Sequence, residues 1–287
     1  MKKTLVAILI SCLAFSAAAQ TFEKLYTEEV IGDRKHCQGA TGIGNVIFQF
    51  YDGAPAIDIY DLSTGKALGS VALEGKKTYH CNNAVVSSTY YRQGDEFPLI
   101  YVSQENKVEH LILVFRITRD KNGTFAADVV QKIILPAPIE MGLYYPNVVM
   151  DIDAGELIIT GFSWESWNKP TRGNSLQFVK FKTPSAASPQ VTLSTSDIQD
   201  RWTDEFLLAT QGAAIKGGML YQVYGGPPTQ FICCYNLATK NLVWKYNLIE
   251  SGIPNEPEGL FIIGDTIYVV DVLKNVYSLP LDMHRAD

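Results

Sequence analysis

The stretch "HCQGATGIGNVIFQFYDG", residues 36–53, decides the fold because its pattern recurs along the chain. The segment "TQGAAIKGGMLYQVYGG" (210–226) has the same order of glycines and apolar residues, with Gln211 aligned on Gln38. "HCNNA" (80–84) repeats the start, and "EGLFIIGDTIYVVDVLKNVYSLPL" (258–281) has Glu258 where the two longer copies have glutamine. Repetition on this scale predicts one supersecondary unit for each copy.

Five copies are found once the looser ones beginning at residues 80 and 145 are included, and each consists of short β-rich runs separated by turn residues. An aromatic residue closes the third run of each copy, at spacings of 42 to 66 residues: Tyr60, Phe115, Phe181, Tyr235 and Tyr277. Four-stranded repeats of about 40–50 residues are typical of propeller blades. We predict an all-β, five-bladed β-propeller over residues 20–287, or six blades if the long third segment holds a degenerate one. Only residues 194–208 favour a short helix.

The fifth copy ends after its third strand, so one outer strand is missing from the last blade. "FEKLYTEEVI" (22–31) is strand-like and precedes the first copy. We predict that it pairs beside Val276–Leu279 and closes the ring.

The N-terminal segment has the order of a secretory signal: Lys2 and Lys3, an apolar run, and small residues that end at Ala19. We expect residues 1–19 to be a signal peptide, or alternatively Cys12 to be the acylated residue of a lipoprotein. No later apolar run approaches the about 20 residues of a membrane span. The protein is therefore expected to be exported, to the periplasm, the cell surface or the medium.

The charge of the chain argues against one class of partner. Its formal net charge is −6, and loss of Lys2 and Lys3 would make it −8, with the remaining cations scattered. Nucleic acid is an unsuitable partner because phosphate binding requires clustered cations. No Walker loop, "HExxH", "GxSxG" or EF-hand pattern is present.

One polar position recurs where the first strand of each copy begins. In a propeller these strands line the central channel, so the five side chains should gather at its mouth: Gln38, Asn82, Asn147, Gln211 and Glu258. They either bond to neighbouring backbone and water, or they bind a ligand or cation around Glu258.

Aromatic residues on polar loops are expected on the same face. Tyr145 precedes a first strand, and Trp164 and Trp167 belong to the long loop 163–174. These rings either cover blade edges or form a binding surface for a sugar or a peptide side chain.

The cysteines suggest no metal centre. His36-Cys37 and His80-Cys81 occupy equal positions in adjacent copies, but neighbouring residues on a strand point to opposite sides. We therefore predict no structural zinc and no cofactor. A Cys37–Cys81 disulfide and free thiols both stay open.

The pattern resembles that of secreted β-propeller proteins common in Bacteroidetes-type bacteria, which implies a fold and no chemistry. "TQG" (210–212) followed one blade later by "EG" (258–259) also resembles the five-bladed glutaminyl cyclases, which implies that Gln211 and Glu258 hold the polar head of a substrate. The "NELE" and "TGK-W" elements of that family are not found. "NEPEG" (255–259) is similar to the glutamate-bearing strands of lactonase-like propellers, which implies calcium.

These observations favour an exported propeller that binds a glycan or protein ligand through the channel-mouth face. The alternative is an enzyme on the same face, either similar to glutaminyl cyclases or a metal-dependent lactonase or lyase.

Overall fold

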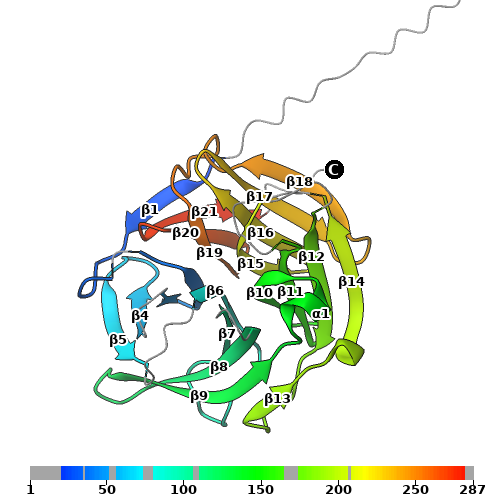
Figure 1. Cartoon of the computed structure of the whole chain (residues 1–287). Coiled ribbons are helices and arrows are strands. Elements are labelled where there is room, and N and C mark those ends of the chain that lie inside the picture. The colour runs from blue at the N-terminus through cyan, green and yellow to red at the C-terminus, as the bar shows by residue number, and fades with distance from the viewer. Residues whose placement is uncertain are drawn as a thin grey trace, which may run out of the picture.

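Five antiparallel sheets surround a central channel in the computed structural model of the chain (Figure 1). The structure describes residues 21–34, 36–51, 56–73, 80–105, 110–164, 174–205 and 208–281. The innermost strands, which contact one another between neighbouring blades, are β2, β6, β10, β15 and β19. The predicted five-bladed β-propeller is thus confirmed, and the six-bladed alternative is not found.

The blades follow one another along the chain. Blade 1 consists of β2 (Gly39–Ile43), β3 (Val46–Phe50), β4 (Ala56–Asp61) and β5 (Ala67–Ala72). Blade 2 consists of β6 (His80–Val86), β7 (Ile100–Glu105), β8 (His110–Arg119) and β9 (Phe125–Ile134), and blade 3 of β10 (Tyr144–Asp151), β11 (Glu156–Phe162), β12 (Leu176–Lys182) and β14 (Ile198–Asp204). Blade 4 consists of β15 (Thr210–Lys216), β16 (Met219–Gly226), β17 (Thr229–Asn236) and β18 (Asn241–Asn247). Blade 5 begins with β19 (Pro257–Ile263), β20 (Thr266–Asp271) and β21 (Asn275–Pro280).

The N-terminal strand β1 (Glu23–Thr27) completes blade 5. It pairs antiparallel with β21, with Glu23 opposite Ser278 and Thr27 opposite Asn275. Figure 1 shows this meeting of the blue and red ends of the ribbon. The predicted closure by residues 22–31 is therefore confirmed.

The aromatic residue that closes each third strand anchors its blade. All five are at most 2% exposed: Tyr60, Phe115, Phe181, Tyr235 and Tyr277. In every blade the register between the third and outer strands shifts at or beside this residue. Such bulges increase the local twist, which lets the outer strand follow the propeller surface.

An insertion between β12 and β14 joins blades 2 and 3. The strand β13 (Gln190–Thr192) pairs parallel with β9 of blade 2, and the Gln131 side chain donates hydrogen bonds to the carbonyls of Ser185 and Ser188 at 2.7 and 2.8 Å. The expected helix over 194–208 is wrong beyond a single 3₁₀ turn, Thr195–Asp197. Most of that segment is β14, the outer strand of blade 3. The one α-helix among the described residues is the short α1 (Pro138–Met141).

Three buried charged side chains and one half-buried arginine lie together where β1 and β21 meet blade 1. We call them the closure cluster: Glu28, Arg34, Asp58 and Lys274, with Tyr51 and Tyr60 beside them. Asp58 is fully buried and accepts hydrogen bonds from Arg34 Nε at 3.1 Å and Nη2 at 2.7 Å. Lys274, also fully buried, donates to the Tyr60 hydroxyl at 2.6 Å, and its Nζ lies 3.9 Å from Asp58 Oδ2. The cluster thus ties blade 5 to blade 1.

None of the helices in the described ranges is long and apolar enough to cross a membrane.

Candidate functional site

Bulges in the first strands direct side chains toward the channel mouth. The register shifts between Cys81 and Asn83 in β6, and between Pro257 and Gly259 in β19. The register also shifts by one residue in β10, between Tyr144 and Asn147, and in β15, between Thr210 and Ala213. A bulge leaves its extra residue unpaired in the ladder and re-aims that side chain. The residues at these four bulges include Asn82, Tyr145, Gln211 and Glu258.

The glycine after the polar residue has a packing role. A Cβ on Gly212 would collide with the backbone of Leu260, and one on Gly259 would lie 2.6 Å from Ala40 Cβ. Only glycine permits such close approach of neighbouring first strands. The "QG" at 211–212 and the "EG" at 258–259 therefore let the first strands of adjacent blades come close enough to bring their polar side chains together.

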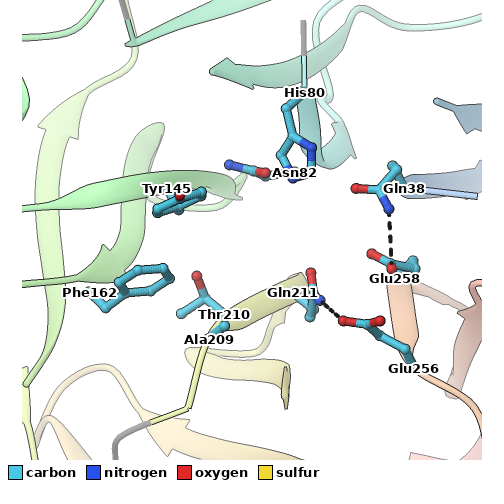
Figure 2. Close-up of a pocket in the computed structure, with 10 residues that line it drawn as sticks. All are labelled: Gln38, His80, Asn82, Tyr145, Phe162, Ala209, Thr210, Gln211, Glu256 and Glu258. Atoms are coloured by element: carbon cyan, nitrogen blue, oxygen red, sulfur yellow. Dashed lines mark hydrogen bonds between the residues drawn. The ribbon is translucent and has the colours of Figure 1, made fainter. Parts of the chain in front are cut away.

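These side chains surround a pocket of about 220 Å³ at the channel mouth (Figure 2). All five blades contribute to it. Its described lining residues are Gln38, His80, Asn82, Tyr145, Phe162, Ala209, Thr210, Gln211, Glu256 and Glu258.

One wall of the pocket carries two carboxylates from blade 5, each hydrogen-bonded to a neighbouring amide. Gln38 Nε2 donates to Glu258 Oε1 at 3.3 Å, and Gln211 Nε2 donates to Glu256 Oε1 at 2.9 Å. Glu258 is only 2% exposed. Burial raises the pKa of Glu256, and the bond from Gln211 and the charge on His80 oppose that rise only in part. Glu256 can therefore hold a proton more readily than an exposed glutamate.

The opposite wall is aromatic, as Figure 2 shows. Tyr145 stacks on Phe162 with centroids 4.9 Å apart, and Phe162 stacks on Trp164 at 4.2 Å. Tyr145 has a φ of 54°, a left-handed conformation that costs a residue with a side chain about 1–2 kcal/mol. Strain of this kind concentrates at functional sites, and here it presents a ring to the pocket.

Some buried polar atoms at and near the mouth have no hydrogen-bond partner among the described residues. Thr210 lines the pocket, and its Oγ1 is buried without a hydrogen-bond partner among the described residues. Asn147 is fully buried one layer deeper, and neither its Oδ1 nor its Nδ2 has a partner there. Asn83, in the same layer, donates to the carbonyls of Val148 and Ala213 at 2.7 and 3.1 Å. This layer therefore links blades 2, 3 and 4 across the channel.

The structure brings five of the eight predicted ligand-binding residues to the pocket: Gln38, Asn82, Tyr145, Gln211 and Glu258. Asn147 does not line it, because the β10 bulge places Tyr145 at the mouth instead. Trp164 is 5% exposed and lies behind Phe162, so it supports the aromatic wall from within the blade. Trp167 lies outside the described residues.

Sequence reasoning missed half of the pocket lining: His80, Phe162, Ala209, Thr210 and Glu256. Glu256 had a detectable signal, since it stands two positions before Glu258 in "NEPEG". Residues two apart on an extended strand point to the same side. Phe162 had no comparable signal because it lies at the end of a second strand.

The described cysteines Cys37, Cys81, Cys233 and Cys234 are buried free thiols, so no Cys37–Cys81 disulfide is present. Burial raises the pKa of the Cys37 thiol well above its ordinary value, which makes it unreactive. Within the described part of the chain, no three His, Cys, Asp or Glu side chains gather as a metal site would require.

The sequence matches no family model and no curated protein. Among solved structures, the glutaminyl cyclase of Myxococcus xanthus is similar over 91% of this chain and 96% of its own, with a TM-score of 0.52 and 9% identity. A chain of a nidogen/laminin complex matches over 88% of this chain and 80% of its own, with a TM-score of 0.46 and 15% identity. The Cps50 (Swd1) β-propeller domain of Myceliophteria thermophila matches over 85% of this chain and 83% of its own, with a TM-score of 0.40 and 10% identity. At such identities the cyclase likeness concerns the propeller fold alone.

Proposed function

We propose that this chain is an exported binding protein and that its channel-mouth pocket holds one sugar residue of a glycan. The observation that carries the proposal is the strained Tyr145 ring, which faces carboxylates and amides across a small pocket (Figure 2). A pyranose has an apolar C–H face and a rim of hydroxyls. It would pack that face on the ring and bond its rim to the polar wall.

The size and donor set of the pocket support a single unit. A volume of about 220 Å³ lies below the roughly 300–1,000 Å³ of sites for drug-sized ligands, so it suits one ring rather than a chain. Glu256 and Glu258 accept hydrogen bonds, and Gln38, Asn82 and Gln211 can both donate and accept. Hydroxyl groups, which also do both, match such a wall.

Calorimetric titration with methyl glycosides of common hexoses and aminohexoses would test the proposal. Tyr145→Asn removes the ring while asparagine tolerates the left-handed backbone. We expect this variant to bind at least about tenfold more weakly, which corresponds to about 1.4 kcal/mol. Tyr90→Asn is the matched control, because Tyr90 is 49% exposed and lies outside the pocket.

Saturable binding that is lost in Tyr145→Asn and kept in Tyr90→Asn supports sugar recognition. No binding to any of these glycosides would refute it. Binding of peptides in place of sugars would assign the same pocket to the end or side chain of a protein ligand.

A second candidate is an enzyme on the same face, similar to glutaminyl cyclases. The observation in its favour is the pKa of Glu256, which burial raises although Gln211 donates a hydrogen bond to it, since a carboxyl group that keeps its proton more readily can act as a general acid. Conversion of an N-terminal glutaminyl peptide, abolished by Glu256→Gln, would support the enzyme. Stoichiometric binding of a sugar without turnover would support the binding protein.

A further inference from the structure

The two walls of the pocket attract the same kind of group. Glu256 and Glu258 project from blade 5, and the rings of Tyr145 and Phe162 come from blade 3 on the opposite side (Figure 2). The described lining thus includes two carboxylates and, as the only side chain able to carry positive charge, His80. The whole chain is also acidic, with a formal net charge of −6.

Carboxylates in a partly buried site interact strongly with a cation. Glu258 is 2% exposed, and burial makes an ionised carboxylate costly unless its charge is matched. The amides of Gln38 and Gln211 donate hydrogen bonds to the two acids but are neutral. A cationic ligand group would therefore gain from both hydrogen bonding and charge.

The aromatic wall favours the same group. The face of an aromatic ring carries partial negative charge and attracts a cation within about 6 Å of its centre. Tyr145 is held there at the cost of backbone strain, and its stacking on Phe162 fixes the orientation of the ring. The buried Thr210 Oγ1 at the same pocket, which has no partner among the described residues, supplies a further acceptor.

We infer that the preferred ligand is an amino sugar whose protonated primary amine lies between the carboxylates of Glu256 and Glu258 and the Tyr145 ring. This inference rests on the proposed sugar-binding function and names the chemical class of its ligand. It predicts discrimination between sugars that share one ring and differ in one substituent.

Three ligands test it by calorimetry near neutral pH: the methyl glycosides of glucosamine, glucose and N-acetylglucosamine. They carry an amine, a hydroxyl and an uncharged acetamide on the same carbon. We expect the glucosamine derivative to bind at least about tenfold more tightly than either of the others, which is the affinity ratio for about 1.4 kcal/mol.

Variants show which residues produce the preference. Glu258→Gln and Glu256→Gln should each reduce the glucosamine-to-glucose affinity ratio toward one, because the new amide still bonds a hydroxyl but carries no charge to attract the amine. Glu23→Gln, at an exposed site on β1, makes the same charge change away from the pocket and should leave the ratio unchanged.

The outcomes separate this inference from the proposed function. Equal affinity for the three glycosides overturns amine recognition and leaves sugar binding in place. Binding to none of them, together with binding of n-butylamine or a glycyl peptide, overturns sugar binding and supports amine recognition. Binding of calcium ions in place of all these probes overturns both.

Discussion

Asp58 of the closure cluster and Glu256 of the channel-mouth pocket are compensated differently, whereas burial raises the pKa of Glu28 in the cluster as it does that of Glu256. In the closure cluster, Asp58 lies against Arg34 and Lys274. Burial raises the pKa of Asp58, but hydrogen bonds from Arg34, Ser70 and Tyr51 outweigh that effect and leave it below its ordinary value. In the pocket, burial prevails and the pKa of Glu256 stays raised.

Under the proposed function, Asp58 belongs to the residues that hold the ring and Glu256 to those that contact a ligand. Removing one partner of a buried ion pair leaves an uncompensated charge and is strongly destabilising. A carboxylate matched chiefly by amides costs folding free energy, and proteins keep such costs mainly at functional sites. The comparison predicts opposite effects of substitution in the two regions.

The largest effect is expected from Lys274→Met. It removes a fully buried cation and leaves Asp58 and Glu28 with less compensation, so we expect a loss of about 3–5 kcal/mol. Denaturant unfolding would measure it. Lys240→Met is the control, since Lys240 pairs with Asp200 on the surface with side chains 38% and 32% exposed, and should cost less than about 1 kcal/mol. Equal losses in the two variants would contradict a structural role for the cluster.

An intermediate effect is expected from Gly65→Ala, which tests the closure from the side of blade 1. Gly65 has a φ of 69°, and a Cβ there would collide with the Tyr26 ring of β1. We expect a loss of about 1–3 kcal/mol from strain and displacement of β1. Gly123→Ala, with a φ of 85° and open space around it, controls for backbone strain alone. A difference of zero between the variants would show that β1 does not depend on this contact.

A smaller effect of opposite sign is expected from Glu256→Gln. Because the folded-state pKa of Glu256 is raised above its unfolded value, its stabilising contribution is complete at low pH and is lost as pH rises through the folded pKa. The variant should therefore melt at or above the wild-type temperature at alkaline pH, by no more than about 2–4 °C. The difference in melting temperature between the variant and the wild type should disappear at acidic pH. A variant that melts lower than wild type at alkaline pH would assign Glu256 to the fold.

The smallest effect on stability is expected from Glu258→Gln. If Glu258 binds the ligand, the Glu258→Gln variant should melt at a temperature close to that of the wild type. Its affinity for the amino sugar should be clearly lower. A glutamate that supports the fold would instead lose about 1–3 kcal/mol on substitution. Thermal melting and titration of this one variant distinguish the two roles.

The fold could be predicted because its periodic features are local in the sequence. Each blade closes its third strand with a buried aromatic residue, and the polar-glycine pair marks a close approach of neighbouring first strands. The helix predicted over 194–208 was wrong because the alternate residues of β14 that face the blade, such as Asp200 and Trp202, are only partly buried. Several of them are polar, so the sequence shows no alternation of apolar and polar residues that would indicate a strand.

The pocket could be predicted only in part because bulges depend on strand pairing. An alignment of polar residues selects Asn147, whereas the bulge in β10 places Tyr145 at the mouth. The backbone strain at Tyr145 and the stacking of Phe162 behind it likewise depend on neighbouring strands. Such features follow from tertiary packing, which a single sequence does not display.

The pairing of β1 with β21 also determines the order in which the ring can form. Glu23 and Ser278 become neighbours only after the four intervening blades have brought them together. Joining segments so distant along the chain carries the largest entropy of loop closure in the molecule, and contacts of high sequence separation form slowly. Pairing of β1 with β21 is therefore expected to be a late step in the formation of the ring.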